Sequence, residues 1–327
     1  MTVCKQPVAT LALNATSSYV VMIRVWGRGR LLIRKSKNTM EHNNYDIAVL
    51  LATYNGGKYI WEQLESLFQQ SCKQFHLYVR DDGSSDDTMK IVEQFHGMFP
   101  DRVTILKDSQ KHRGAAKSFM YLLENVDSEY YMFCDQDDIW LLEKIEKTLA
   151  RMKEIEKAVA DAPKVVMDGT AAKNVPILVA TDLGIVDEQL NLLSESFNKD
   201  LKIDVFRKHP ELICVRHVVT GCTMMFNRAA KLAALPMSPR ATMHDEWVAL
   251  CVHFKGGVIS ILDDATILYR QHTSNTLGAE QARKGFFARA IARAGQKQFF
   301  QVAKLLHKDF GLSYLKFLMY KILYSWF

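Results

Sequence analysis

Four apolar runs that alternate with amphipathic helical stretches constrain this chain more than any other feature. The first run, Ile47 to Ala52, is continuously apolar and ends in a polar turn, which is typical of a buried parallel strand. Further strand-like runs cover 75–80, 103–106 and 130–134. Between them, apolar residues recur at helical spacing. The alternation predicts a doubly wound, mostly parallel α/β sheet with helices on both faces.

Beyond residue 140 the pattern is less regular. A flexible, substrate-side loop is expected over 160–210, around one strand at 177–181. The other expected elements are a charged helix at 141–159, a return of ordered structure at 218–226, a helix at 243–254, and a pair of strands at 258–261 and 265–270.

Charge is distributed unevenly along the 327 residues. Residues 1–44 hold seven Lys and Arg against one acid, and residues 281–327 hold nine against one, whereas 45–280 has eight more acidic than basic residues. A nucleic-acid groove would place its positive charge on the folded face, so we expect no nucleic-acid partner. We predict three regions: a basic, poorly ordered extension (1–44), a catalytic domain (45–280) and a basic amphipathic tail (281–327).

The cysteines and the hydropathy of the chain indicate the cellular compartment in which it works. Six cysteines are scattered without a Cys-x-x-Cys pair, so neither a disulfide framework nor a thiolate zinc site is indicated. No apolar stretch reaches the roughly 18 to 20 residues that a membrane-spanning helix needs. A cytoplasmic location is expected.

Polar side chains follow three of the predicted strands. The carboxyl ends of parallel strands share one edge of an open sheet, and ligands bind there. Five carboxylates at one edge need a positive partner, and hard oxygen ligands suit Mg²⁺ or Mn²⁺. We therefore expect a divalent cation bridging a diphosphate. The three clusters are Thr53-Tyr54-Asn55, Asp81-Asp82 and Asp135-Gln136-Asp137-Asp138.

These residues resemble the glycosyltransferase family 2 enzymes of GT-A fold, and within them the rhamnosyltransferase-like members. The resemblance covers about residues 45–275 and implies a Rossmann-like nucleotide-binding half joined to an acceptor-side half. It rests on ordered blocks of sequence: LLATYNGGKYIWEQLESLFQQS, VRDDGSSDDT, CDQDDIW, TGCTMMFNR, MHDEW and YRQHTSNTLGA.

The resemblance implies donor-binding roles for the first two clusters. Thr53 and Tyr54, with Asn55 beside them, would line the nucleoside pocket. Asp81 or Asp82 would accept a hydrogen bond from the pyrimidine ring.

The third cluster contains the Asp-x-Asp motif of the family. By the resemblance, Asp135 would hold the ribose or a metal-bound water, and Asp137 would bind the metal ion. Asp138 could substitute in either role.

Further candidate residues lie after position 240. Asp245 opens a predicted helix, as an N-terminal cap or as a general base. The resemblance implies that Asp245 is the base, with Glu246 as second candidate. It also implies that His272, otherwise an ordinary surface histidine, is a metal ligand or phosphate contact. Arg270 could contact the diphosphate through its bidentate fork.

The tail combines basic residues with aromatic and aliphatic ones. This composition is typical of an interfacial anchor on the anionic inner leaflet of the cell membrane. The alternative is a helix packed on the catalytic domain. An anchor would be separable from the domain by truncation after about residue 282.

Together these features predict an inverting, metal-dependent glycosyltransferase. It would move a sugar from a nucleoside diphosphate to a hydroxyl of a cell-surface polysaccharide or lipid-linked saccharide. The resemblance implies rhamnose from dTDP-rhamnose, and a UDP-hexose (glucose, galactose or N-acetylhexosamine) is the alternative donor. A catalytically inactive nucleotide-sugar-binding module is a third reading. A dehydrogenase is disfavoured because Asn55-Gly56-Gly57 does not offer the G-x-G-x-x-G fingerprint.

Overall fold

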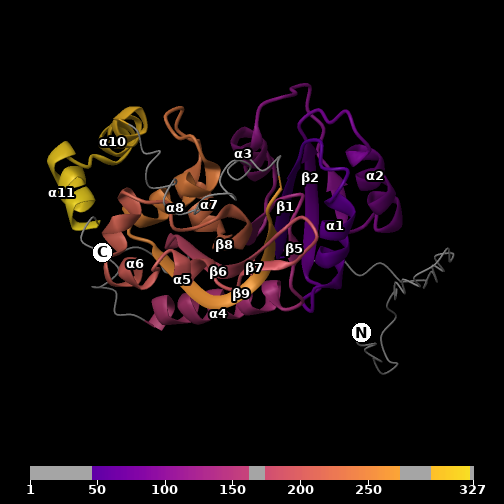
Figure 1. The fold of residues 1–327 in the computed structure, drawn as a ribbon, viewed down its shortest axis with the longest axis horizontal. Helices are drawn as coiled ribbons and strands as arrows, with labels where there is room; N and C mark the ends of the chain where they lie inside the picture. The colour runs from indigo at the N-terminus through magenta and orange to yellow at the C-terminus, as the bar shows by residue number, and fades with distance from the viewer. Residues whose placement is uncertain (1–45, 162–173, 273–295, 325–327) are drawn as a thin grey trace, which may run out of the picture. The chain divides into compact units, whose positions relative to one another are not determined.

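A computed structural model describes residues 46–161, 174–272 and 296–324 (Figure 1). The expectation for 1–44, and that for the start of the tail, lie outside the described residues. The described residues all belong to one compact unit.

The described residues build a mixed sheet of nine strands, with the order β3-β2-β1-β4-β8-β6-β9-β5 and β7 beside β6. Neighbours among β1 to β4 are parallel, whereas β8 is antiparallel to both β4 and β6. The strands are β1 (Ile47–Thr53), β2 (Phe75–Asp81), β3 (Val103–Ile105), β4 (Tyr130–Cys134), β5 (Ile139–Trp140), β6 (Ile177–Val186), β7 (Leu192–Ser194), β8 (Met224–Asn227) and β9 (Val258–Arg270).

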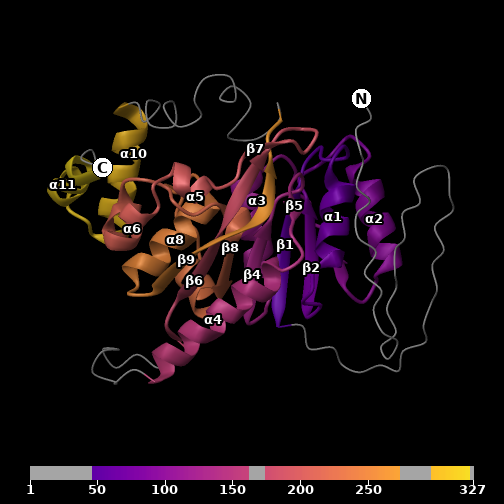
Figure 2. The same cartoon turned by 60° about the horizontal axis from the view of Figure 1, so that its bottom comes forward.

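Helices cover both faces of the sheet because alternate strand residues point to opposite sides. Ala48 and Leu50 of β1 pack with α3, α7 and α8, whereas Val49 and Leu51 pack with α1, α2 and α4. In Figures 1 and 2, α10 and α11 lie at the end of the unit far from α2. The helices are α1 (Ile60–Gln69), α2 (Thr88–Met98), α3 (Ala115–Asn125), α4 (Lys144–Asp161), α5 (Phe197–Asp200), α6 (Asp204–Lys208), α7 (Arg228–Ala234), α8 (His244–Phe254), α10 (Gln296–Phe310) and α11 (Tyr314–Tyr324), with short 3-10 helices η2 (Pro210–Cys214) and η3 (Gly221–Thr223).

The alternation predicted between residues 45 and 140 is confirmed, and two expectations beyond it are corrected. The expected strand pair is the single strand β9, because the exposed Asp263 and Asp264 interrupt its apolar pattern at a register shift without ending it. Residues 160–210 are not one irregular loop, since β6 continues to Val186 and β7, α5 and α6 follow. The ordered structure expected at 218–226 contains η3 and the start of β8.

Helices α10 and α11 pack on the domain. Their buried residues Leu306 and Phe317 belong to the same core cluster as β1 and α8. Phe310 stacks on Phe254 of α8 with ring centroids 4.4 Å apart. For residues 296–324 the structure therefore shows the packed alternative, and truncation would remove part of the core. Among the described helices, none is both long and apolar enough to cross a bilayer.

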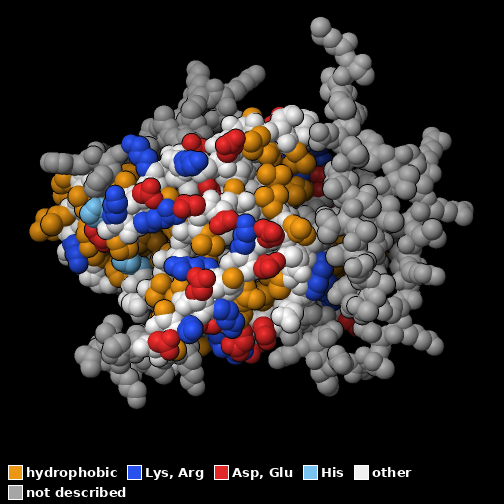
Figure 3. All heavy atoms as spheres, turned by 90° about the horizontal axis from the view of Figure 1, so that it is seen from below, with side chains coloured by type: hydrophobic (Ala, Val, Ile, Leu, Met, Phe, Trp, Pro, Cys, Tyr) orange, Lys and Arg blue, Asp and Glu red, His pale blue; other side chains and the backbone are white. Residues whose placement is uncertain are grey.

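The same two helices also carry an exposed apolar surface, which we call the α10–α11 face. Figure 3 shows hydrophobic side chains beside Lys and Arg at the left edge of the molecule, the side on which α11 lies in Figure 1. The face consists of Phe300, Tyr314, Leu315, Leu318, Met319 and Ile322.

We expect Phe317→Ala to destabilise the whole domain. Phe317 is 1% exposed within the main core, so its truncation should cost about 3–5 kcal/mol. Calorimetric unfolding of the full chain should show a lower melting temperature in one transition. Leu315→Ala, at a position of α11 that is 70% exposed, is the matched control and should melt like the unmodified chain. An unchanged main transition in Phe317→Ala would show that the tail is separable.

Candidate active site

The three polar clusters meet at one edge of the sheet, as predicted. The parallel register places Thr53 beside Asp81, and the Thr53 hydroxyl donates to Asp81 Oδ1 at 2.9 Å. Gln136 joins the third cluster to the first, since its Oε1 accepts from the Tyr54 N–H at 2.9 Å and its Nε2 donates to the Tyr54 carbonyl at 3.0 Å. A Cβ at Gly56 would lie 2.2 Å from Gln136 Oε1, so glycine is needed there.

The predicted nucleoside-binding residues divide into exposed and structural ones. Tyr54 is half exposed, with its ring edge-on to His112 at 5.5 Å. Asn55 has a φ of 49°, and its Oδ1 accepts from the Ser85 N–H at 2.8 Å. Asn55 therefore joins the loops after β1 and β2, while the Tyr54 ring stays partly exposed.

Asp81 and Asp82 both accept hydrogen bonds from the protein and differ in exposure. Asp82 is buried and accepts from Arg80 at 2.9 Å, from the Arg113 N–H at 2.9 Å and from the Gly114 N–H at 2.7 Å. Burial alone would raise the pKa of Asp82, but these donors outweigh it and the pKa is lowered. Asp82 thus holds the loop that leads into α3. Asp81 is partly exposed, and besides Thr53 it accepts from the Gly83 N–H and from the N–H and hydroxyl of Ser84, so it also fixes its own turn.

The two predicted metal ligands, Asp137 and His272, lie together although 135 residues separate them. His272 Nε2 is 2.8 Å from Asp137 Oδ2, and its ring stacks on Tyr59 with centroids 4.6 Å apart. A carboxylate and an imidazole held in contact suit a divalent cation.

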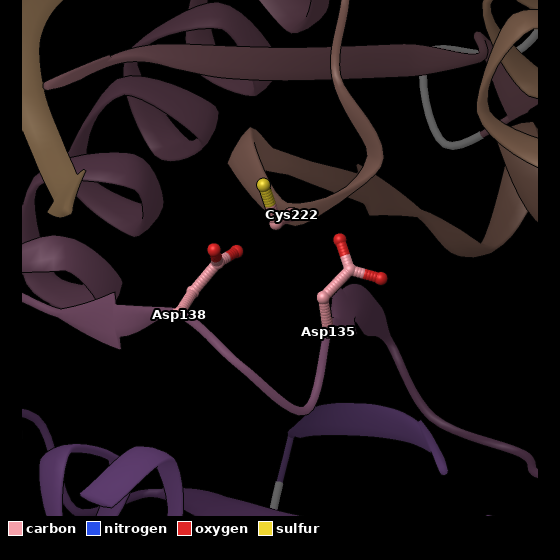
Figure 4. Close-up of side chains that lie close together, drawn as sticks. All are labelled: Asp135, Asp138 and Cys222. Atoms are coloured by element: carbon pink, nitrogen blue, oxygen red, sulfur yellow. The ribbon is translucent and has the colours of Figure 1, made fainter. Parts of the chain in front are cut away.

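A second group of potential ligands lies beside this pair. Figure 4 shows Asp135 and Asp138, on the segment after β4, on either side of Cys222 of η3. Ligand atoms of these three side chains all lie within 4.8 Å of one another. Burial and the neighbouring Asp137 and Asp245 raise the pKa of Asp135 to about 7. Carboxylates this close and this buried favour a bound cation, so the residues present fit a Mg²⁺ or Mn²⁺ site.

Asp138 itself lies beneath the site. It is fully buried, with Oδ1 accepting from the Arg270 N–H at 3.3 Å and Oδ2 unpartnered among the described residues. Lys144 is buried nearby with Nζ 4.6 Å from the centre of the Trp140 ring, and burial lowers its pKa to about 8. This internal lysine was not anticipated, because a charged residue in a helical pattern is ordinarily solvated.

Arg270 is held by groups of the protein. Its guanidinium donates to the Asp137 carbonyl at 3.0 Å, the Glu188 carbonyl at 3.0 Å and Glu62 Oε2 at 2.5 Å. The side chain is 4% exposed and packs on Tyr59. Arg270 therefore braces the loop that carries Asp137, and its contact with a diphosphate stays a prediction.

Asp245 lies in the first turn of α8, and its carboxylate is not the helix cap, because the N-cap residue is Met243. Asp245 Oδ2 accepts from the Gly221 N–H at 3.0 Å, and Oδ1 accepts from the Glu246 N–H at 2.8 Å. A Cβ at Gly221 would lie 3.0 Å from His244 Nε2, so glycine permits the close approach of η3 to the start of α8. Asp245 thus adjoins η3, which also carries Cys222 of the acidic group.

The histidines around Asp245 differ in charge. His244 is buried between the rings of Phe119 and Phe133, and burial lowers its pKa to about 4, so it is neutral. His217 Nε2 is 3.4 Å from Asp245 Oδ2. Sequence reasoning missed His217, since nothing in the surrounding apolar run distinguishes it.

The sequence profile of Glycosyl transferase family 2 matches residues 48–230, more than half of the chain. The chain belongs to this family. For this family 2 chain, the matched range contains the clusters after β1, β2 and β4, and it ends before Asp245 and His272.

Individual relatives match over part of their length. The chain is 40% identical to the dTDP-rhamnosyl transferase RfbG of Shigella flexneri over 102 residues, which is 30% of this chain and 35% of that protein. In fold it is similar to TarS 1-349 of S. aureus in complex with UDP-GlcNAc, with a TM-score of 0.51 and 18% identity over 82% of this chain and 73% of that one. It is also similar to the mannosyltransferase PcManGT from Pyrobaculum calidifontis in complex with GDP-Man and Mn²⁺, with a TM-score of 0.53 and 16% identity over 82% and 66%. The predicted GT-A fold is confirmed.

Proposed function

We propose that this chain transfers a sugar from a nucleoside diphosphate to a saccharide hydroxyl, with inversion and with a bound Mg²⁺ or Mn²⁺. The observation that carries the proposal is the arrangement of one site: Asp137 and His272 in contact at the carboxyl edge, with Asp245 beside η3. Membership of family 2 supports the reaction class.

The chain's residues account for the reaction as a single displacement. Asp245 takes the proton of the acceptor hydroxyl, and the oxygen attacks the anomeric carbon on the face opposite the leaving group. The bond to the diphosphate oxygen breaks, and the diphosphate leaves with the bonding electrons. The cation, held by Asp137 and His272 with Asp135 at the ribose or a metal-bound water, would stabilise the charge on the diphosphate. Arg270 keeps the Asp137 loop in place.

The donor nucleoside would lie over the ends of β1 and β2. Tyr54 offers a ring for the base and Asp81 an acceptor for its N–H, while Thr53 donates to Asp81 and Asn55 joins the loops after the two strands. Rhamnose from dTDP-rhamnose is the first candidate, supported by the identity with RfbG over about a third of each chain. A UDP-hexose is the alternative.

Donor turnover with and without EDTA tests the class. Full-length protein should consume one nucleotide sugar with Mn²⁺ and lose this activity with EDTA. Thermal shift with Mn²⁺ against dTDP-rhamnose, UDP-glucose, UDP-galactose and UDP-N-acetylglucosamine should identify the donor as the one that raises the melting temperature most. Binding without turnover of any donor, with acceptor supplied, would support the inactive binding module.

We further propose that the α10–α11 face rests on the anionic inner surface of the cell membrane, where a lipid-linked acceptor is presented. Lys304, Lys308 and Lys316 are exposed on the same two helices. Asp309, the acid of these helices, is paired with Arg240 at 3.1 Å. The charge of the face is therefore complementary to anionic lipid.

Replacing Leu315, Leu318 and Met319 by Ser should weaken binding to phosphatidylglycerol vesicles by about tenfold or more, because their side chains are exposed and available for insertion. Co-sedimentation measures this, and added salt should reduce binding of the unmodified chain. Leu232→Ser, at an exposed position on α7, is the control. If the triple variant binds as well as the original, or if it instead dissociates a dimer, the face does not contact lipid.

A further inference from the structure

The carboxylate of Asp245 has a charged partner, His217, to which the transfer steps described above give no role. His217 lies in the segment between η2 and η3, and its Nε2 is 3.4 Å from Asp245 Oδ2. The same Nε2 contacts the Val219 carbonyl, so Nε2 carries the proton. The side chain is 30% exposed, which leaves the ring accessible to solvent.

Asp245 needs such a partner because the charges around it are otherwise mostly negative. Asp135 approaches from the end of β4, and Glu246 follows on α8. His244, the other titratable neighbour on α8, is kept neutral by the rings on either side of it. A buried carboxylate near other carboxylates would ordinarily take up a proton.

We propose that His217 is a positioning residue for the transfer reaction: as an imidazolium in contact with Asp245, it keeps that carboxylate ionised and oriented next to Gly221. The proposal rests on the function assigned above, in which Asp245 is the base.

The direction of the pKa shifts agrees with this geometry. Burial alone would raise the pKa of Asp245, but His217 and the hydrogen bonds outweigh it, and the pKa lies well below its usual range. Burial would lower the pKa of His217, but Asp245 and Glu246 outweigh it and raise it to about 9. At neutral pH both partners are therefore charged. Without His217, the carboxylate would retain its burial and its acidic neighbours, so its pKa should rise.

His217→Gln tests the proposal, because glutamine keeps a donor for the Val219 carbonyl but carries no charge. The acid limb of kcat/KM against pH should move upward by about 1–3 pH units relative to the unmodified chain, with donor KM little changed. A role limited to holding the segment would lower the melting temperature and leave the acid limb in place, and that result would overturn the proposal. Glu211→Gln, whose partner is His209 rather than His217, is the control.

Imidazole NMR of the full chain provides a readout that does not depend on turnover. The His217 resonance, assigned by its absence in His217→Gln, should titrate near pH 9 and shift downward by about 1–3 units in Asp245→Asn. An unshifted titration would overturn the coupling of the two groups. If the coupling is present but Asp245→Asn retains full turnover, the assignment of the base has failed and the ion pair has not.

Discussion

Asp137→Ala should reduce sugar transfer by about 10³-fold or more while the domain remains folded. Asp137 is the carboxylate in contact with His272, and its removal takes a charged ligand from the cation that would stabilise the departing diphosphate. The loss should appear in single-turnover measurements with saturating donor, and increasing Mn²⁺ should restore part of it, since a weakened site can still be filled.

The control for this variant is Asp87→Ala. Asp87 precedes α2, is exposed and makes no side-chain cap hydrogen bond, so its removal should leave activity and melting temperature unchanged. Near-normal transfer by Asp137→Ala at ordinary Mn²⁺ would refute the metal assignment.

Asp245→Asn should lower kcat by about 10²–10⁴-fold with little effect on donor affinity. Asparagine can still accept from the Gly221 N–H, so the backbone around η3 should be preserved while the proton acceptor is lost. Rapid-quench measurement of kcat, together with nucleotide binding by calorimetry, separates the two effects.

Glu246→Gln is the matched comparison on the same helix turn. Burial raises the pKa of Glu246, so this side chain, unlike Asp245, holds a proton more readily than its ordinary counterpart. If Glu246→Gln loses turnover and Asp245→Asn retains it, the roles of the two neighbours are reversed.

The position of the polar clusters at the carboxyl edge of the sheet could be predicted, because the sequence pattern that indicates it is local. Each apolar strand is followed directly by its polar cluster, and parallel strands place their carboxyl ends together whatever the connections are. The contact of Thr53 with Asp81 and the approach of Tyr54 to Gln136 follow from that rule. The expectation about the sheet edge therefore needed no long-range information.

Roles that depend on distant partners could not be read in the same way. Asp81 and Asp82 are adjacent residues of the same type, and they differ because Arg80 and the α3 loop donate to Asp82, whereas Thr53 and the Gly83–Ser84 turn donate to Asp81. In the sequence Arg270 looks available to bind a ligand, but in the structure its guanidinium donates to Glu62, which is more than 200 residues away in the chain. His217 is recognisable only beside Asp245. In each case the deciding contact is a side chain from another element, and a single sequence does not indicate such contacts.

The position of α8 links two parts of the molecule that have so far been treated separately. Its first turn carries Asp245, and its last residue, Phe254, stacks on Phe310 of α10. Nine residues of helix separate these points by about 14 Å. Because α8 is one continuous helix, a displacement of the tail helices would be transmitted along it to the Asp245 carboxylate. The length of α8 also sets the distance between the reacting hydroxyl and any surface that α10 and α11 contact.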